Sequence, residues 1–338
     1  MDLTFLPDRL LPWFRDHARD LPWRQDREPY HVWLSEVMLQ QTRVEAVKNY
    51  YARFLAALPT VEALAQAPEQ QLLRLWEGLG YYSRVRNLQK AAQIITDTLG
   101  GVFPADLAGW RALPGVGDYT AGAVCSICYG LPTPAVDGNV LRVYARLTLL
   151  EDAVDEPAVK KRITRALAQL YPAGQCGDFT QALMELGATV CVPNGAPDCG
   201  RCPVADLCGA RREERWAQLP VKTPKKARTV QERTVLLLEF GDTLGFEKRP
   251  DTGLLAGQWQ LPNREGTLTP QQALDWAAEL GARPEALLGS LSRTHVFTHL
   301  EWHMTGYRIR CGAVGPGLTA ARPGELPLPS AFKVLLKK

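Results

Sequence analysis

Four of the eight cysteines in the chain lie in one short segment, CVPNGAPDCGRCPVADLC. Cys191, Cys199, Cys202 and Cys208 follow the spacing C-x7-C-x2-C-x5-C. In a reducing compartment such a group indicates a metal site rather than a set of disulfides. Zinc ribbons have two C-x2-C pairs and this segment has one, whereas iron–sulfur loops vary more in spacing. The segment therefore predicts a metal centre, with an iron–sulfur cluster favoured over zinc.

A second candidate is LPGVGDYTAGAV, in which Gly115 and Gly117 bracket a valine before a helix expected to begin near Tyr119. Glycines let backbone amides approach an anion closely, and a helix N-terminus adds a favourable dipole. The string could thus hold a phosphate without any lysine. A tight turn between two helices explains the same glycines, so both interpretations stay open.

Two carboxylates complete the set of candidates. Glu36, in WLSEVMLQQTRV, has apolar helical neighbours, and burial would raise its pKa enough for a general acid. The alternative is a solvated glutamate on the outer face of that helix. Asp137, in PAVDGNVLRV, would by itself be the N-cap of the following helix.

The elements that must position these residues fall into two regions. Residues 1 to about 215 show apolar spacing of three and four residues with Gly or Pro at the ends, which predicts an all-α region. The basic, proline-containing stretch LPVKTPKKARTVQER predicts a boundary near 220–230. Beyond it, β-branched and aromatic segments flank the helical string TPQQALDWAAELGA, which predicts an α+β domain.

Composition sets wider bounds. The chain has 338 residues, 46% of them hydrophobic, and a net charge of +3, which neither demands nor excludes nucleic acid. It shows no secretory signal and no apolar run of about 18 residues, so we expect a cytoplasmic protein. Cys125 and Cys128 form a C-x2-C pair on a helix, where small buried side chains are expected.

Five strings in order resemble the MutY-type adenine DNA glycosylases over nearly the whole first region: LPWRQDREPYHVWLSEVMLQQTRV, GLGYYSR, LPGVGDYTAGA, VDGNV and QALMELGATVC. The resemblance implies an all-α helix-hairpin-helix catalytic region at 1–220. Within it, a six-helix barrel would span about 23–130. An iron–sulfur helical domain would combine 1–22 with 131–220, and a linker would occupy 221–230.

The same resemblance implies roles for the candidates. The hairpin would bind the backbone of one DNA strand. Asp137 would be the essential aspartate, oriented by Asn139. The four cysteines would ligate a 4Fe-4S cluster that staples a DNA-facing loop. The gap between Cys191 and Cys199 is one residue longer than is usual in the family, so we expect the loop before Cys199 to bulge.

A mechanism follows from these roles. Chemistry on a paired base requires extrusion of its nucleotide. By resemblance, Tyr81 and Gln41 would fill the gap, and Trp23, Arg24 and Gln181 would line the adenine pocket. Glu36 would protonate the departing adenine and then activate water. Ionised Asp137, favoured by a helix N-terminus, would stabilise the sugar cation.

Two rival functions remain. A bifunctional glycosylase and lyase of the endonuclease III type would need a lysine nucleophile at the start of the second hairpin helix. The matching position here is Tyr119, which is instead expected to pack near the sugar. A non-catalytic mismatch-binding protein would not need both Glu36 and Asp137.

The second domain, 231–338, resembles the Nudix-like recognition domain of the same family. Its helix carries Asp275 and Glu279 but no R-E-x2-E-E run, so hydrolysis of phosphate esters is not expected. The resemblance implies that Phe297, Thr298 and His299 sense 8-oxoguanine opposite the adenine. The expected partner is double-stranded DNA with an A:8-oxoguanine or A:G mismatch, bound by a monomer that would associate with the nucleoid if the protein is prokaryotic.

Three histidines in this domain recur every fourth residue. His295, His299 and His303 would share one face if they lay in a single strand. No cysteine lies near them in the sequence, so we do not expect them to bind a metal.

Overall fold

The computed structural model describes residues 2–224, 227–250 and 252–337. Contacts divide the described chain into two compact units. The helical unit comprises the chain up to Glu69 together with Ser83–Pro224, and the second unit comprises Gln70–Tyr82 together with the chain after Pro224. Among the described residues no helix is long and apolar enough to cross a membrane.

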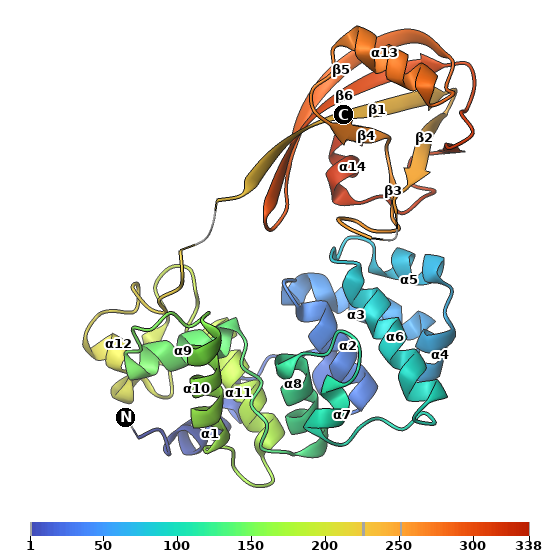
Figure 1. The fold of residues 1–338 in the computed structure, drawn as a ribbon. Coiled ribbons are helices and arrows are strands. Elements are labelled where there is room, and N and C mark those ends of the chain that lie inside the picture. Colours follow the sequence, from blue (N-terminus) through green and yellow to red (C-terminus); the bar gives the residue numbers. More distant parts are fainter. Residues whose placement is uncertain (1, 225–226, 251, 338) are drawn as a thin grey trace. The chain divides into compact units, whose positions relative to one another are not determined.

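The helical unit is built almost entirely from helices, as the spacing predicts (Figure 1). Their bounds in chain order are α1 Leu6–His17, α2 Pro29–Leu39, α3 Val44–Ala57, α4 Val61–Gln66, α6 Ser83–Asp97, α7 Leu107–Arg111, α8 Asp118–Tyr129, α9 Gly138–Thr148, α10 Pro157–Ala168, α11 Cys176–Thr189 and α12 Gly209–Arg212, with short 3-10 turns η1 Pro22–Arg24, η2 Cys199–Arg201 and η3 Ala205–Leu207.

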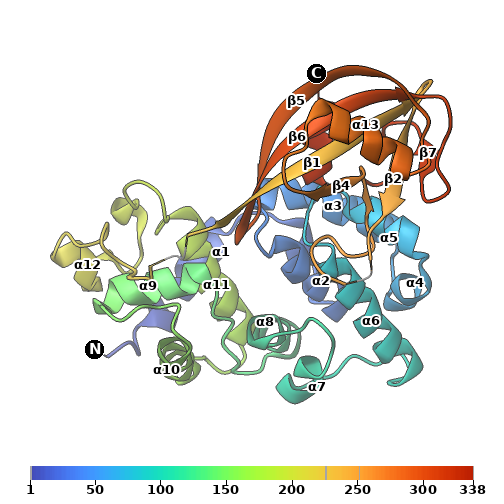
Figure 2. The ribbon, with the colours of Figure 1, turned by 45° about the horizontal axis from the view of Figure 1, so that its top comes forward.

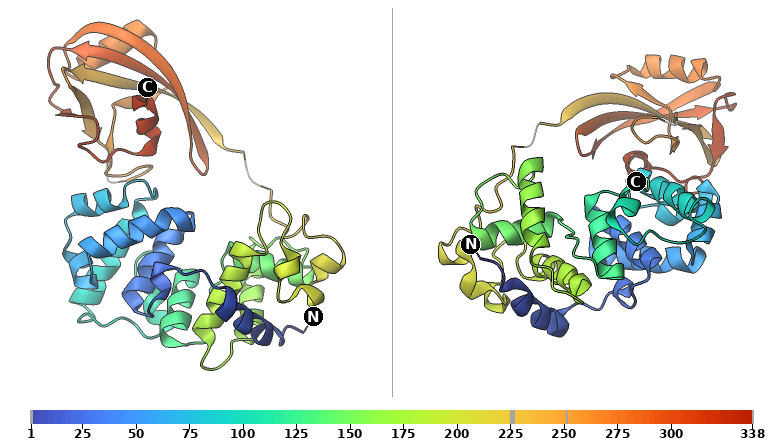
Figure 3. Two further views of the ribbon diagram at one scale, coloured as in Figure 1. Left: turned by 180° about the vertical axis from the view of Figure 1, so that it is seen from behind. Right: turned by 60° about the horizontal axis from the view of Figure 1, so that its bottom comes forward.

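Helix α2 is apolar around most of its circumference and is buried accordingly, packed against α3 and α8. Helix α11 packs against α1, α8 and α9, and Figures 2 and 3 show it running between them. Two glycines of α11 permit this approach. A Cβ at Gly177 would meet Ile127 Cα at 2.9 Å, and one at Gly187 would meet Asn139 Cβ at 2.5 Å. The side chains of α2, α8, α9 and α11 are thereby brought to one centre.

The second unit is an α+β domain, which confirms the predicted class. Its elements are β1 Thr229–Phe240, β2 Thr243–Lys248, β3 Trp259–Gln260, β4 Asn263–Glu265, α13 Pro270–Glu279, β5 Pro284–Val296, β6 Leu300–Cys311, β7 Thr319–Ala321 and α14 Ser330–Leu336. The described strands form a seven-stranded sheet in the order β3-β2-β1-β6-β5, with β4 on β1 and β7 on β2.

Two cores cover the two faces of this sheet. Helix α13 packs Ala273, Trp276 and Ala277 against the face that carries Tyr307 and Ile309. Helix α14 lies on the opposite face of the sheet (Figure 1). It packs Ala331, Phe332 and Leu335 there, with Trp302 and Met304. Side chains on both faces of β6 are therefore buried in apolar layers. For this reason apolar and polar residues alternate only partially in its sequence.

The segment 70–82, which contains most of α5 Glu69–Trp76, groups with the second unit. Arg74 Nη2 donates to the Glu325 carbonyl at 3.1 Å, and Lys333 Nζ donates to Glu77 Oε1 at 2.5 Å. Of the predicted linker 221–230, residues 225 and 226 lie outside the described residues. Its first residues are held by the helical unit, since Thr223 N donates to Asp155 Oδ1 at 2.9 Å.

Candidate active site

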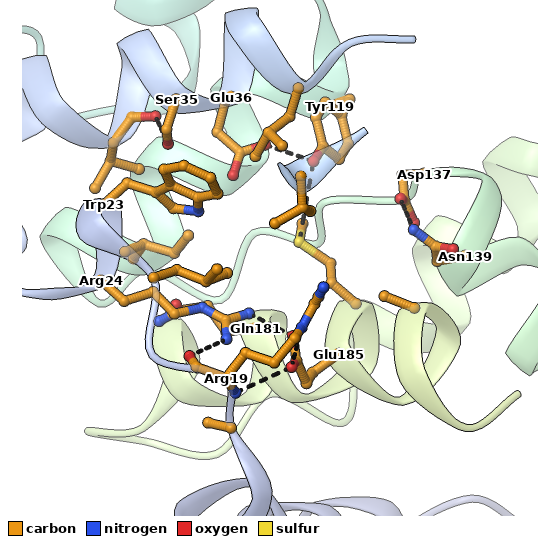
Figure 4. Close-up of a pocket in the computed structure, with 18 of the residues that line it drawn as sticks. Arg19, Trp23, Arg24, Ser35, Glu36, Tyr119, Asp137, Asn139, Gln181 and Glu185 are labelled. Carbon is orange, nitrogen blue, oxygen red and sulfur yellow. Dashed lines mark hydrogen bonds and ion pairs between the residues drawn. The ribbon is translucent and has the colours of Figure 1, made fainter. Parts of the chain in front are cut away.

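A cavity of about 1040 Å³ opens in the helical unit, between α2, α8, α9, α11 and the segment that follows α1 (Figure 4). Residues that the sequence predicted for chemistry or base binding meet in its wall. They are Trp23, Arg24, Glu36, Gln41, Tyr119, Asp137, Asn139 and Gln181. The cavity therefore joins positions that are up to about 160 residues apart in the chain.

Glu36 is an acid in an apolar wall, as predicted. It is 6% exposed, and burial raises its pKa to about 7. This pKa is the net result of several causes: the charge of Asp137 acts in the same direction as burial, while a 2.5 Å hydrogen bond from the Tyr119 hydroxyl to Oε2 and the charge of Arg24 act against it. A carboxyl group that titrates near neutrality can both donate and accept a proton, as general acid–base catalysis requires.

Asp137 has the capping role that its sequence position predicts, and it also faces the cavity. It lines the cavity, and it is the N-cap of α9, since its Oδ1 accepts from Val140 N at 2.8 Å. We expected the helix N-terminus to favour its ionised form. That expectation is wrong for the net pKa, which is raised because burial outweighs the hydrogen bonds from Val140 and Asn139.

Asn139 and Arg142 fix the orientation of Asp137. Asn139 Nδ2 donates to Asp137 Oδ2 at 2.7 Å, and Arg142 Nη2 donates to Asn139 Oδ1 at 2.9 Å. Arg142 also donates to the Gly187 carbonyl and, through Nε, to the Cys191 carbonyl, both at 2.7 Å. This chain of bonds leads from the carboxylate to the first residue of the cysteine segment.

Glu185 is a further charged residue of the cavity wall that was not predicted from the sequence. Its carboxylate is fully buried on α11 and accepts from Arg19 Nε at 2.6 Å and from Arg24 Nη2 at 2.8 Å (Figure 4). Burial raises its pKa, but the two arginines outweigh burial and hold the pKa below its ordinary value. Glu185 stands one helical turn after Gln181 in QALMELGATVC, so i, i+4 spacing could have identified it.

The other residues predicted to bind the adenine or to fill its gap in the DNA lie in different surroundings. Trp23 is buried and packs edge-on to Tyr51, with ring centroids 5.5 Å apart. Gln181 contributes an amide from α11. Gln41 lies just past the end of α2 with a positive φ of 58°. Tyr81 also has a positive φ, 47°, but it belongs to the second unit and does not line this cavity.

The two glycines of the hairpin, Gly115 and Gly117, are there for different physical reasons. Gly115 has φ +76°, and a Cβ there would lie 2.7 Å from Asn87 Cβ, so both conformation and space require glycine. Gly117 precedes α8 in an extended conformation, and its missing Cβ would point into open space. The amides at the start of this twelve-residue helix are therefore left uncovered by a side chain at 117, as an anion site needs.

The four clustered cysteines line one cavity of their own, together with Arg146 and Trp216. Arg146 is 4% exposed, and its Nη1 donates to Cys191 Sγ at 3.3 Å. The seven-residue gap is closed by a hydrogen bond from Asp198 N to the Val190 carbonyl, 3.0 Å long. Within the described chain, no three or more His, Cys, Asp or Glu side chains are arranged to hold a metal ion.

The predicted lesion-sensing residues form the turn between β5 and β6. Phe297 N donates to the Leu300 carbonyl at 2.7 Å, which leaves Thr298 and His299 at the tip. Phe297 packs on the buried Trp302, with ring centroids 4.9 Å apart, so it anchors the turn. The Thr298 and Tyr81 hydroxyls are 2.9 Å apart, within the second unit.

The three histidines do not share a strand, so that expectation is wrong. His295 lies in β5, His299 in the turn and His303 in β6, because a hairpin interrupts the run. His303 is instead held between Glu232 and Glu301, and the hydrogen bond with Glu301 raises its pKa.

The cavity combines groups for acid–base work with groups for recognition. One carboxyl that titrates near pH 7 and a second that is fixed by an amide and a helix N-terminus face the same space. This is the pairing used to cleave glycosidic bonds through a positively charged sugar. Beside them, two half-buried arginines and an amide offer donors and acceptors to a flat heterocycle.

Comparison with known protein families gives one match in each of the two regions of the chain. Residues 34–171 match the HhH-GPD superfamily of base excision DNA repair proteins, and residues 234–338 match the NUDIX domain. The human adenine DNA glycosylase is 35% identical over 387 aligned positions, which cover 96% of this chain and 70% of the human protein. That of Buchnera aphidicola from Acyrthosiphon pisum is 30% identical, covering 89% of this chain and 85% of the relative.

Solved structures share the helical part of the fold. A thermostable thymine-DNA glycosylase aligns with a TM-score of 0.55 and 27% identity over 62% of this chain and 96% of its own. A trapped endonuclease III–DNA covalent intermediate, an estranged-adenine complex, aligns with a TM-score of 0.54 and 25% identity. It covers 63% of this chain and 99% of its own.

Proposed function

The chain belongs to the adenine DNA glycosylases, enzymes of base excision repair that cleave N-glycosyl bonds, and from this premise we propose that it removes adenine lying opposite 8-oxoguanine or guanine in duplex DNA. The observation that carries the proposal is the buried Glu36, with a pKa near 7, facing the same cavity as Asp137. The cavity is large enough for an extruded nucleotide base.

Glu36 is the general acid in this proposal. Protonation of a ring nitrogen turns adenine into a neutral leaving group, and the carboxylate that remains can then take a proton from the attacking water. Burial makes the first step possible, because the raised pKa keeps part of the Glu36 population protonated at neutral pH. The Tyr119 hydrogen bond to Oε2 leaves Oε1 to act on the base.

Asp137 stabilises the positive charge that develops on the sugar. Its raised pKa remains compatible with this role, since Val140 and Asn139 donate to its two oxygens and favour the anion against burial. The approach of a cationic sugar would favour ionisation further.

Recognition of adenine is assigned to the polar floor of the cavity. The Gln181 amide has the donor and acceptor needed for the N7 and N6 edge of adenine. Glu185 holds Arg24 at 2.8 Å, so the guanidinium is fixed before a base arrives. Trp23 supplies a flat apolar wall.

Tyr119 favours a monofunctional enzyme. A lyase needs an amine to attack the sugar, and here a phenol occupies the predicted lysine position with its pKa raised well above the ordinary value by burial. Adenine release without strand cleavage is therefore expected.

We propose that the cysteine segment holds a 4Fe-4S cluster. Cys191, Cys199, Cys202 and Cys208 line one cavity, and the buried Arg146 brings a positive charge toward the sulfur of Cys191. Thiolate ligands of a cluster carry net negative charge, which this guanidinium would offset. When bound, the cluster would tie η2, η3 and the end of α11 together.

The second unit is proposed to read the base opposite the adenine, through the turn at Phe297, Thr298 and His299. Its support is geometric: Thr298 and His299 occupy the tip of a hairpin anchored by Trp302. We propose double-stranded DNA with an A:8-oxoguanine or A:G mismatch as the partner and a monomer as the active form.

One assay tests the proposal. Duplexes carrying A opposite 8-oxoguanine, G, C or T are incubated with the protein and scored for strand breaks before and after alkali. Breaks that need alkali and favour the first two duplexes are expected. Release of no adenine from any duplex would overturn the proposal, and borohydride trapping of a covalent complex would restore the bifunctional rival.

A further inference from the structure

Helix α2 ends in a strained turn. Leu39 accepts from Thr42 N at 3.2 Å, Gln40 has φ −57° and ψ 113°, and Gln41 has φ 58°. These values describe a type II β-turn with Gln41 at its third position, where glycine or asparagine is strongly preferred. A long side chain kept at a glycine position indicates that the side chain is needed there.

Arg84 holds this turn from the outside. Its Nη1 donates to the carbonyls of Val37 at 2.7 Å, Met38 at 3.1 Å and Gln40 at 2.7 Å. These carbonyls belong to the last turn of α2 and to the residue that caps it, where backbone acceptors have no partner within the helix. A cation here also opposes the negative end of the helix dipole.

The turn is joined to the hairpin as well. Gln40 Nε2 donates to Thr120 Oγ1, on α8, at 3.4 Å. Arg84 and Asn87 stand three residues apart on α6, and Asn87 packs against Gly115 of the hairpin. One face of α6 therefore touches both the turn that presents Gln41 and the glycine turn that precedes α8.

We propose that Arg84 is a positioning residue for extrusion of the target nucleotide: its guanidinium fixes the α2 turn, so that the exposed Gln41 is already in place as a wedge before DNA arrives. The proposal rests on the proposed function for the existence of an extruded base. The proposal is one of preorganisation. The hydrogen bonds of Arg84 offset the backbone strain at Gln41 when the protein folds, so that this cost does not arise when DNA binds.

Three variants test it in the full-length protein. Arg84→Met removes the donors and keeps the length of the side chain, and Arg84→Lys restores an ammonium that can donate to the same carbonyls. Arg86→Met is the matched control on the same helix, because Arg86 Nε donates to Glu69 at 2.9 Å. Circular dichroism and thermal melting establish that each variant is folded.

Extrusion is followed by the fluorescence of 2-aminopurine placed at the target position opposite guanine, which needs no bond cleavage. We expect Arg84→Met to slow the fluorescence rise about tenfold or more, Arg84→Lys to recover most of that loss, and Arg86→Met to match the parent. Gln41→Ala combined with Arg84→Met should be no slower than Gln41→Ala alone, because Arg84 acts through Gln41.

A second substrate separates positioning from general damage to α2, which also carries Glu36. When the target adenine faces an abasic gap, little unpairing is needed, and Arg84→Met should then lose much less of its single-turnover excision rate. Arg84→Met could instead lose the same share of its single-turnover excision rate on an A:G duplex and on the duplex with the abasic position, or show the same fluorescence rise as the parent. Either result would overturn the proposal. A parent protein that extrudes the analogue but releases no adenine would overturn the proposed function alone.

Discussion

The Tyr119 hydroxyl donates a 2.5 Å hydrogen bond to Oε2 of Glu36 and thereby lowers the pKa of a carboxyl group that burial raises to about 7. The same phenol contacts Met184 Sδ at 3.9 Å, on α11, so α8 ties the acid to the recognition side of the cavity. Tyr119 thus adjusts the pH at which Glu36 exchanges its proton.

Tyr119→Phe should shift the pH dependence of adenine release. Loss of the hydrogen bond removes an interaction that favours the carboxylate, so the Glu36 pKa should rise above about 7. Glu36 would then stay protonated to higher pH, and the alkaline limb of the single-turnover rate should move upward. A limb that stays in place or moves to lower pH would contradict this role for Tyr119.

Glu36→Gln should abolish adenine release while leaving mismatch binding largely intact, because the amide keeps the shape but has no proton to transfer. Single-turnover excision and filter binding on the same duplex check both halves. A rate within about tenfold of the parent would exclude Glu36 as the acid.

The same variant should be more stable than the parent at alkaline pH. The folded pKa of Glu36 is raised from 4.5 to about 7, so ionisation destabilises the native state as pH rises through this range. Since one pKa unit corresponds to about 1.4 kcal/mol, this ionisation should cost the native state a few kcal/mol. Urea unfolding should therefore show a gain for Glu36→Gln at pH 8 that shrinks toward pH 4.

Glu185→Ala should destabilise the helical unit, because it leaves Arg19 and Arg24 without their shared buried carboxylate. Breaking such a pair costs about 3 kcal/mol or more in the free energy of unfolding. Asp152→Ala is the control, since the Asp152–Arg162 pair is exposed and should cost less than about 1 kcal/mol. Similar losses in urea unfolding for both variants would argue against a structural role for the buried group.

Local sequence patterns indicated that Glu36 is buried, but they did not indicate the charged residues that form the rest of the cavity wall. Glu36 stands among apolar residues of one helix, so its burial could be inferred from α2 alone. The buried Glu185 and its half-buried partners Arg19 and Arg24 join α11 to the segment after α1, and no local pattern records a pairing across 166 residues. Arg84 is similar, because its partners are backbone carbonyls, which carry no sequence signal.

Where local rules compete, the tertiary environment decided the outcome. The helix N-terminus at Asp137 acts as predicted, but the depth of the cavity reverses the direction of its pKa shift. The spacing of His295, His299 and His303 would place them on one face of an unbroken strand, and the turn at Thr298 separates them. Both errors arose from treating one segment without the elements packed around it.

Purified without oxygen, the protein should be brown and contain iron and sulfide, with four thiolates from the cysteine segment as ligands. Cys199→Ser should lower both the iron content and the yield of folded protein, because a cluster that joins loop ends also supports folding. Cys311→Ser, a buried cysteine of the second unit, is the control and should leave the iron content unchanged. A colourless parent with stoichiometric zinc would contradict the cluster.

The last prediction concerns Thr298 at the tip of the β5–β6 hairpin. The hydroxyl lies 2.9 Å from the Tyr81 hydroxyl, and the turn is fixed because Phe297 packs on Trp302 while Arg233 stacks on the same indole at 4.5 Å. An oxidised guanine differs from guanine by an oxygen at C8 and a proton at N7, and a hydroxyl can donate to the first or accept from the second. Thr298→Ala should therefore weaken binding and excision on A:8-oxoguanine by about 1 to 3 kcal/mol relative to A:G. Thr298→Ser keeps the hydroxyl and should retain the discrimination. Equal losses on both duplexes would mean that this turn adds general affinity for DNA and does not read the lesion.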